Sequence, residues 1–224
     1  MEQAVLLLSG GLESATLLKQ LEGEGKKVLC LTFEYGQKNI QEVRVARELA
    51  MHLRHFIVEI DSGVFSSSAL IRKDIKVKRG RTDEDRKEVG NTYVPARNLL
   101  FLSYALSLAE SEGIEEIAIG ISRPSSVGYP DCYPDFLKTF EIVGGLATKR
   151  GREGKRIKVS APFQDMSKRE VIELGLGLGV DYGKTFSCFD PIEFKSCGSC
   201  DTCQVRLEAF KKVGVKDPLE YYGK

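Results

Sequence analysis

The stretch "LLLSGGLESATLL", residues 6–18, joins a short apolar run to a segment with helical spacing through a serine and two glycines. A continuous apolar run of this length is typical of a strand buried on both faces of a parallel sheet. Glycines let backbone amides approach an anion closely, and a helix N-terminus adds a partial positive charge. The stretch therefore predicts either a tight structural turn or a phosphate-binding loop. It lacks the Gly-Lys-Ser/Thr ending of Walker A and the third glycine of the dinucleotide fingerprint.

The same alternation of strand and helix continues along the chain. Apolar runs predict strands at residues 4–8, 27–36, 56–60, 114–122 and 157–163. Helical spacing predicts helices at residues 14–25, 40–53, 98–113 and 134–149. Near the C-terminus, Ser167 and Glu170 have the spacing of a capping box. This order predicts an α/β fold, a Rossmann-like parallel sheet with helices on both faces and ligands beyond the carboxyl ends of the strands.

Composition narrows the class of protein. The 224 residues include 33 Lys and Arg against 32 Asp and Glu, and this balance argues against stable nucleic-acid binding. The N-terminal residues lack a basic region and a cleavage site, and their apolar run is too short for a membrane span. We therefore expect a cytoplasmic protein without a membrane segment. Cytoplasmic thiols stay reduced, so the six cysteines suggest metal ligands or core thiols before disulfides.

Four cysteines form the strongest local signal. They lie in "SCFDPIEFKSCGSCDTC" as Cys188, Cys197, Cys200 and Cys203, here called the cysteine quartet. Four thiolates can complete a tetrahedral zinc shell, and an iron–sulfur cluster also takes four cysteines. We favour structural Zn²⁺, held by a small C-terminal segment at residues 186–224 that packs on a main domain at residues 1–185. The strand pattern alone does not place this quartet at the ligand edge of the sheet.

Other polar features allow less specific predictions. The charged loop, residues 72–90, is poor in large apolar groups, so we expect an exposed segment that is either a solvated connection or a mobile cover over a site. Cys30 lies in an apolar strand and is expected in the core. Cys132 lies in a polar loop and is either structural or near a substrate. His52 and His55 are expected at the surface, without a metal or catalytic role.

Several motifs together carry a family resemblance. "SGGLES" resembles the SGGxDS loop of the PP-loop ATP pyrophosphatases, with Glu13 in place of the usual Asp. Ordered with the cysteine quartet over nearly the whole chain, the motifs resemble those of 7-cyano-7-deazaguanine synthases: "SGGLES" (9–14), "TFEYGQK" (32–38), "YVPARN" (93–98) and "GYPDC" (128–132). The resemblance implies a HUP-type fold, a homodimer, and an enzyme that uses ATP, through adenylation, to convert 7-carboxy-7-deazaguanine and ammonia to the 7-nitrile.

The resemblance also implies roles for individual residues. The phosphate loop would bind ATP through Leu8, Ser9, Gly10, Gly11, Leu12, Glu13, Ser14 and Ala15. Glu13, Arg97 and Lys168 are the expected catalytic residues, the last two as cations and Glu13 as first candidate for a ligand of Mg²⁺ bound with ATP. The expected substrate contacts are Tyr35, Gln37, Arg123, Tyr129 and Asp131.

The sequence departs from the family around "GYPDC". Arg123, Pro124 and Ser125 precede this motif where relatives usually have acidic residues, and Tyr133 follows it in place of Arg. The resemblance therefore supports the family's ATP chemistry for this chain more strongly than it supports the family's exact 7-substituted substrate. Two alternatives stay open: another PP-loop adenylating activity, such as deazapurine transfer to a different nucleophile or tRNA thiolation, and a non-catalytic ATP-binding partner protein.

Overall fold

The computed structural model describes residues 2–82, 84–122 and 129–223. Arg123, one of the expected substrate contacts, lies outside these residues. None of the helices within them combines the length and the apolar character needed to cross a membrane.

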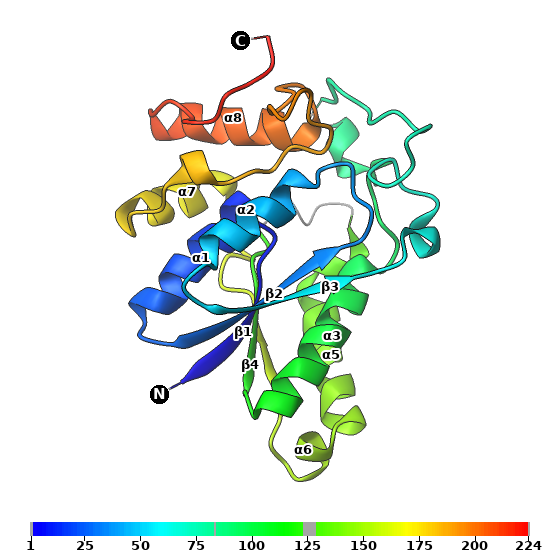
Figure 1. The fold of residues 1–224 in the computed structure, drawn as a ribbon, viewed down its shortest axis with the longest axis vertical. Helices are drawn as coiled ribbons and strands as arrows, with labels where there is room; N and C mark the ends of the chain where they lie inside the picture. The colour runs from blue at the N-terminus through cyan, green and yellow to red at the C-terminus, as the bar shows by residue number, and fades with distance from the viewer. Residues whose placement is uncertain (1, 83, 123–128, 224) are drawn as a thin grey trace.

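One parallel sheet forms the centre of the molecule, with the strand order β3-β2-β1-β4-β5 (Figure 1). Its strands are β1 (Gln3–Leu7), β2 (Lys27–Glu34), β3 (Arg54–Glu59), β4 (Glu116–Ile119) and β5 (Lys158–Ser160). All five strands expected from the apolar runs are present, which confirms the α/β fold. The chain moves outward from β1 through β2 and β3, then returns to pair β4 with β1. Such a reversal of strand order is where open α/β sheets bind ligands.

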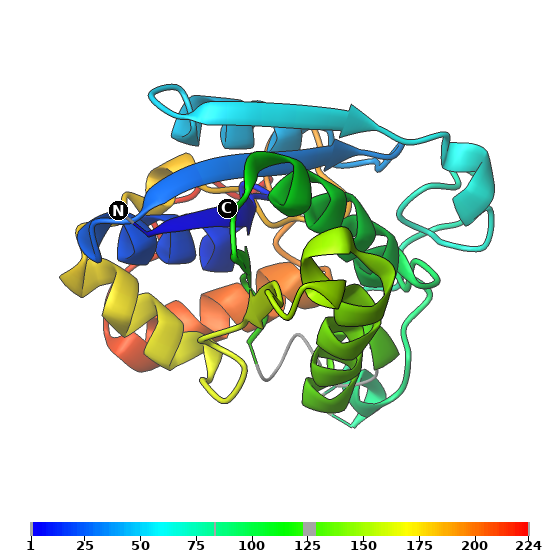
Figure 2. The ribbon, with the colours of Figure 1, turned by 90° about the horizontal axis from the view of Figure 1, so that it is seen from below.

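Helices cover both faces of the sheet (Figures 1 and 2). Their bounds are α1 (Leu12–Gly23), α2 (Gln41–Leu49), α3 (Arg97–Glu112), α5 (Pro134–Ala147), α6 (Lys149–Arg152), α7 (Lys168–Gly177) and α8 (Asp201–Val213). Alternate side chains of β1 enter two separate cores, as the two-residue period of a strand requires. Val5 and Leu7 pack in the core that holds buried residues of α3 and α5. Leu6 and Ala4 pack in the core that holds buried residues of α1, α7 and α8.

Three strands are shorter than the sequence suggests, and the first of them, β2, ends at Glu34 rather than at residue 36. β4 ends at Ile119, because a Cβ on Gly120 would lie 3.0 Å from the backbone carbon of Glu13. The chain therefore leaves the sheet there to pack against the first turn of α1. After β5, the Gln164 amide donates to the Ala161 carbonyl at 3.1 Å, so this segment forms a turn. The capping box at the start of α7 is confirmed, with both reciprocal hydrogen bonds present.

The charged loop is not exposed along its whole length, so the sequence expectation is wrong in part. Val77 is buried in a cluster with the cysteine quartet. The Gly80 amide donates to the Ser199 carbonyl at 3.2 Å, and Arg79 Nη2 lies 2.6 Å from Asp190 Oδ2. These bonds hold the loop against the cysteine segment, residues 186–224. The domain boundary expected at residue 185 stays a prediction.

His52, His55 and Cys30, for which no metal or catalytic role is expected, lie in ordinary structural surroundings. His52 Nε2 lies 2.6 Å from Glu22 Oε1. His55 Nε2 lies 2.8 Å from Thr32 Oγ1, and its ring is half-buried rather than fully at the surface. Burial lowers the pKa of His55, and Arg47 acts in the same direction. Cys30 is buried in β2, where burial raises its thiol pKa to about 12.

Candidate active site

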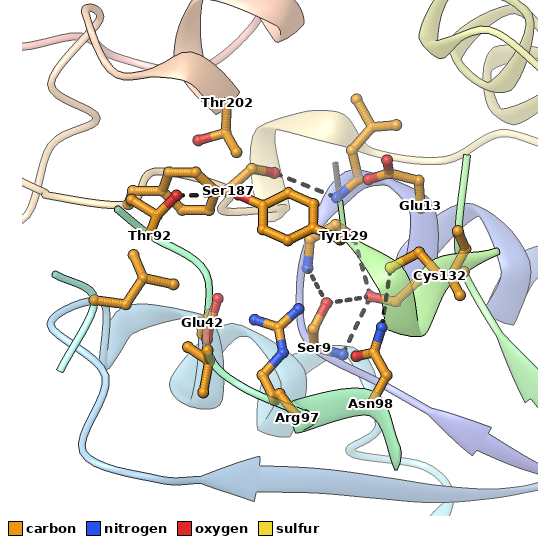
Figure 3. A pocket seen from close by; sticks show the side chains of 18 of the residues that line it. Ser9, Glu13, Glu42, Thr92, Arg97, Asn98, Tyr129, Cys132, Ser187 and Thr202 are labelled. Carbon is orange, nitrogen blue, oxygen red and sulfur yellow. Dashed lines mark hydrogen bonds between the residues drawn. The ribbon is translucent and has the colours of Figure 1, made fainter. Parts of the chain in front are cut away.

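The carboxyl ends of β1, β2 and β4 open onto a cavity of about 320 Å³ (Figure 3). Its wall includes Ser9 after β1, Tyr35 after β2 and Ile121 after β4. The charged loop and the cysteine segment supply further parts of the wall. The cavity therefore lies at the reversal of strand order, as expected for a ligand site in this fold.

The phosphate loop joins β1 to α1 at the base of this cavity. Ser9 Oγ lies 3.1 Å from Ser14 Oγ, and the Gly11 amide donates to Ser9 Oγ at 3.3 Å. Helix α1 begins without a side-chain cap, so its first amides are suited to an anionic ligand. Within the described chain, Gly10 and Ala15 are the two predicted loop residues that stay outside the cavity wall.

Gly10 has a packing role. Its φ angle is +80°, in the left-handed region that favours glycine. A Cβ at this position would lie 2.4 Å from the carbonyl oxygen of Glu42 in α2. The Gly10 carbonyl accepts a hydrogen bond of 2.9 Å from the Phe186 amide. The glycine therefore lets α2 and residue 186 close around the loop.

Replacing Gly10 with alanine is expected to lower the free energy of unfolding by about 2–4 kcal/mol, because strain and a backbone clash add. Urea denaturation measures this loss. Gly25→Ala is the matched control, since Gly25 has a φ of +74° but no atom within 4 Å of an added Cβ. Equal losses in the two variants would contradict the packing role, because backbone strain alone would then explain both.

Glu13 and Lys168 meet at one side of the loop. Lys168 is the first residue of α7, and its Nζ forms an ion pair with Glu13 Oε1. Ser122 Oγ donates to the same oxygen at 2.9 Å. Burial lowers the pKa of Lys168 to about 7, and Arg206 acts in the same direction. The ammonium therefore depends on an anionic neighbour to stay charged near neutral pH.

Arg97 lines the same cavity as this ion pair, at the start of α3. Its Nη1 donates to the Tyr35 hydroxyl at 3.3 Å. The preceding residue, Ala96, has a left-handed φ of 52°, which costs energy in a residue other than glycine. Backbone strain of this kind is often stored at functional sites, so its place beside Arg97 suits a positioned cation.

Asp131 and Cys132 of the "GYPDC" motif pack against the first turn of α3. Asp131 Oδ2 accepts a 2.8 Å hydrogen bond from the Asn98 amide, and Asn98 Nδ2 donates to Cys132 Sγ at 3.1 Å. Asp131, Cys132 and Tyr129 all line the cavity. Burial raises the pKa of the Cys132 thiol to about 12, so the thiol is neutral there. Asp131 thus fixes the helix that carries Arg97, and its contact with a substrate stays a prediction.

Gln37 supports the wall from behind. Its Oε1 accepts from the Tyr35 amide at 2.8 Å, and its Nε2 donates to Glu42 Oε1 at 3.1 Å. Tyr35 and Glu42 line the cavity, whereas Gln37 is buried outside its wall. Direct contact of Gln37 with a substrate stays a prediction. The sequence pattern did not single out Glu42, since a polar residue near a helix start is ordinary.

The far wall comes from two segments that the strand pattern did not place there. Arg81 Nη1 donates to Asp201 Oδ2 at 2.9 Å, and Arg86 Nη2 donates to Gln204 Oε1 at 2.6 Å. Ser187 Oγ accepts from the Leu12 amide at 3.5 Å. The charged loop and the cysteine segment therefore reach the ligand edge together, and the charge density of the loop was the available signal. The charged loop therefore lines the cavity, and its mobility as a cover stays a prediction.

The cysteine quartet gathers at one point. All four sulfurs are buried and lie within 4.8 Å of one another. The sulfurs of Cys188 and Cys200 are 4.0 Å apart, and so are those of Cys197 and Cys203. A tetrahedron of sulfurs about 2.3 Å from zinc has sulfur–sulfur separations of about 3.8 Å, so the donor set and its size fit Zn²⁺. The amides of Cys197 and Asp190 donate to Cys188 Sγ, as suits a thiolate ligand.

The sequence of the chain is similar to those of known proteins. Residues 3–214 match the model of a family described as "Queuosine biosynthesis protein QueC". A protein of Magnetococcus marinus named 7-cyano-7-deazaguanine synthase is 45% identical, over 98% of this chain and 97% of its own. A protein of Rickettsia canadensis with the same name is also 45% identical, over 99% of this chain and 100% of its own.

Two solved structures share the fold. A predicted subunit of a tRNA methyltransferase from Methanocaldococcus jannaschii has a TM-score of 0.52 at 16% identity, covering 100% of this chain and 93% of its own. A 4-thiouridine synthetase solved with RNA and bound ATP has a TM-score of 0.50 at 19% identity, covering 95% of this chain and 50% of its own. At these identities the likeness concerns the fold alone.

Proposed function

Because the chain belongs to the QueC family, we propose that its cavity uses ATP to convert 7-carboxy-7-deazaguanine and ammonia into 7-cyano-7-deazaguanine. One observation carries the proposal: in a chain matched over residues 3–214, the phosphate loop, Arg97 and Lys168 face a single cavity. The chain is thus an ATP-dependent carbon–nitrogen ligase of deazapurine biosynthesis.

The chemistry requires two activations of one carbon. A carboxylate is a poor electrophile, so its oxygen first attacks the α-phosphorus of ATP, forming an acyl adenylate and releasing pyrophosphate. Ammonia then attacks the carbonyl carbon, AMP leaves, and a proton is lost to give the amide. A second ATP activates the amide oxygen in the same way. Loss of AMP and of both amide N–H protons then yields the nitrile, so each nitrile requires two ATP.

The residues divide naturally between these steps. We assign the pyrophosphate to the phosphate loop and the adjacent Lys168, whose ammonium group lies beside the loop at Glu13. We assign Arg97 to the negative charge that develops at the reacting carbon, because oriented cations in a closed site stabilise such charge strongly. Tyr35, Tyr129 and Asp131 are available to contact the deazapurine, because all three line the cavity.

Two metal ions belong to the proposal. Mg²⁺ would neutralise the phosphates of ATP, and the Glu13 carboxylate is its first candidate protein ligand. Zn²⁺ would be held by the cysteine quartet, whose four donors leave no open position. We therefore assign it a structural role, which keeps residues 186–206 against the cavity.

The setting of the enzyme is also proposed. We propose a cytoplasmic homodimer, supported by the family resemblance. The formal net charge of +1 supports a small-molecule substrate over stable binding to nucleic acid.

The decisive experiment is product analysis. Purified protein with 7-carboxy-7-deazaguanine, ATP, Mg²⁺ and ammonium is expected to form the nitrile, with two AMP and two pyrophosphate per product. Mass spectrometry of the base and quantification of AMP measure both. Protein that binds ATP yet forms neither amide nor nitrile would contradict the proposal and favour a different 7-substituted substrate.

Metal analysis tests the remaining PP-loop alternative. Zinc at about one ion per chain supports the ligase, whereas iron together with tRNA affinity would favour a thiolation enzyme.

A further inference from the structure

Glu42 faces the cavity but has no part in the chemistry assigned above. It extends from the first turn of α2 toward the space beside Arg97 (Figure 3). Its Oε1 accepts from Gln37 Nε2 at 3.1 Å, and its Oε2 accepts from Asn39 Nδ2 at 3.4 Å. Gln37 and Asn39 are both buried, so the two donors hold the carboxylate plane in place. Each oxygen keeps a second lone pair for a ligand.

The electrostatics of this wall favour a neutral ligand that donates hydrogen bonds. Arg97 from α3 is the charged group that faces Glu42, and Tyr35 contributes a phenol whose pKa is raised by burial. Burial raises the pKa of Glu42 to about 7, although Arg97 and Gln37 both act to lower it. The carboxylate is therefore ionised above neutral pH. The guanidinium offsets the charge of the carboxylate, so this wall suits a neutral hydrogen-bond donor better than a cation such as ammonium.

Aromatic rings line the adjoining wall. Phe33 stacks on Phe101 with centroids 3.9 Å apart, and Tyr35 meets Phe101 edge-on at 5.5 Å. All three rings line the cavity. A planar, neutral ligand with two adjacent N–H donors on one edge matches a fixed carboxylate beside such a wall.

The guanine-type edge of the proposed substrate has this arrangement, with a ring N–H next to an exocyclic amino group. We propose that Glu42 is the specificity-determining residue for this edge, accepting one hydrogen bond from each group. The inference rests on the proposed function and deepens it. The same carboxylate disfavours the adenine ring of ATP, whose corresponding ring nitrogen is an acceptor.

The experiment compares two substrates in two proteins. Wild-type enzyme receives 7-carboxy-7-deazaguanine or its analogue without the 2-amino group, and kcat/KM is measured for each. We expect the wild type to prefer the parent by about 100-fold, because the analogue leaves a carboxylate oxygen unpaired. In Glu42→Gln, kcat/KM is expected to fall about 100-fold for the parent and less than 10-fold for the analogue. The KM for ammonium should not change. Glu48→Gln, exposed on the same helix, is the matched control and should change neither value.

The pH dependence provides a second readout. Protonation removes the acceptor, so KM of the wild type for the parent should rise about tenfold per unit as pH falls below about 7. That rise should be reduced in Glu42→Gln. Glu42→Asp, which keeps the charge on a shorter arm, should recover part of the preference.

Three outcomes would overturn the inference. The first is equal use of the two substrates by the wild type. The second is an unchanged preference in Glu42→Gln, and the third is a Glu42→Gln defect confined to KM for ammonium. Failure of the wild type to convert the parent at all would instead count against the proposed function, so the two failures are distinguishable.

Discussion

Lys168→Met is expected to lower kcat for nitrile formation by about 100- to 1,000-fold, the range measured when a single charge-stabilising group is removed from an active site. The side chain is only 13% exposed and meets the Glu13 carboxylate at the end of the phosphate loop. Methionine keeps the length of the chain but removes the positive charge next to the proposed pyrophosphate site. The kcat is obtained from the rate at which pyrophosphate and AMP are released at saturating substrate concentrations.

The neighbouring residue supplies the control. Arg169 also lies in the first turn of α7, but it is exposed and pairs with Glu173. Arg169→Met should therefore retain kcat, because surface pairs of this kind contribute little. Lys168→Met leaves Glu13 without its ion-pair partner, so thermal melts must show that the variant is folded. A folded Lys168→Met protein with wild-type kcat would remove this residue from the mechanism.

The variant Glu13→Gln distinguishes the role of Glu13 from that of Lys168. This variant keeps the lysine but loses the proposed ligand of Mg²⁺. Its rate should recover as the Mg²⁺ concentration is raised, whereas the rate of Lys168→Met should stay low at every Mg²⁺ concentration. Equal responses to Mg²⁺ would contradict the separate roles given to Glu13 and Lys168.

Loss of one metal ligand is expected to have the largest effect on stability. Cys200→Ser should lower the bound zinc from about one ion per chain to nearly none and unfold the cysteine segment. Structural zinc sites contribute about 10–16 kcal/mol in small peptides, comparable with the whole stability of a domain. Elemental analysis and thermal denaturation measure the two effects together.

A thiol outside the quartet provides the comparison. Cys30 is also completely buried, but it lies in β2 among apolar residues. Cys30→Ala should keep its zinc and lose only about 1 kcal/mol, because a small cavity replaces the sulfur. The metal-free protein should also be cut by protease within residues 72–90, since that loop is bonded to the cysteine segment. Full stability and protease resistance after removal of the metal would contradict a structural role.

Local patterns predicted the five strands and the helices α1, α2, α3, α5 and α7, but not α6 or α8. The apolar run at residues 4–8 and the capping pair Ser167 and Glu170 act through contacts close in sequence, and both are present. The predicted strands near residues 120 and 161 were too long, because tertiary packing at Gly120 and a turn after β5 end the real strands earlier. Such limits depend on contacts that a local pattern does not contain.

Sequence motifs identified much of the cavity wall, and the roles given to its residues stay predictions. The phosphate loop, Arg97 and Lys168 face one cavity, and the four cysteines converge as their spacing suggested. Glu42 and Ser187 were missed, because each reaches the cavity through the arrangement of segments distant in sequence. Their side chains belong to common residue types in ordinary surroundings, so spacing alone provides no signal for them.

The hydrogen bond from the Phe186 amide to the Gly10 carbonyl has a consequence for synthesis on the ribosome. The phosphate loop leaves the exit tunnel of the ribosome early, but its partners at residues 186 and 187 leave only when most of the chain has been translated. A nascent chain can therefore form its first strands and helix without a finished nucleotide pocket. Contacts this distant in sequence also slow folding, because the chain must close a long loop before they form. The wall that residues 186 and 187 contribute to the cavity is therefore completed only when most of the chain has been translated.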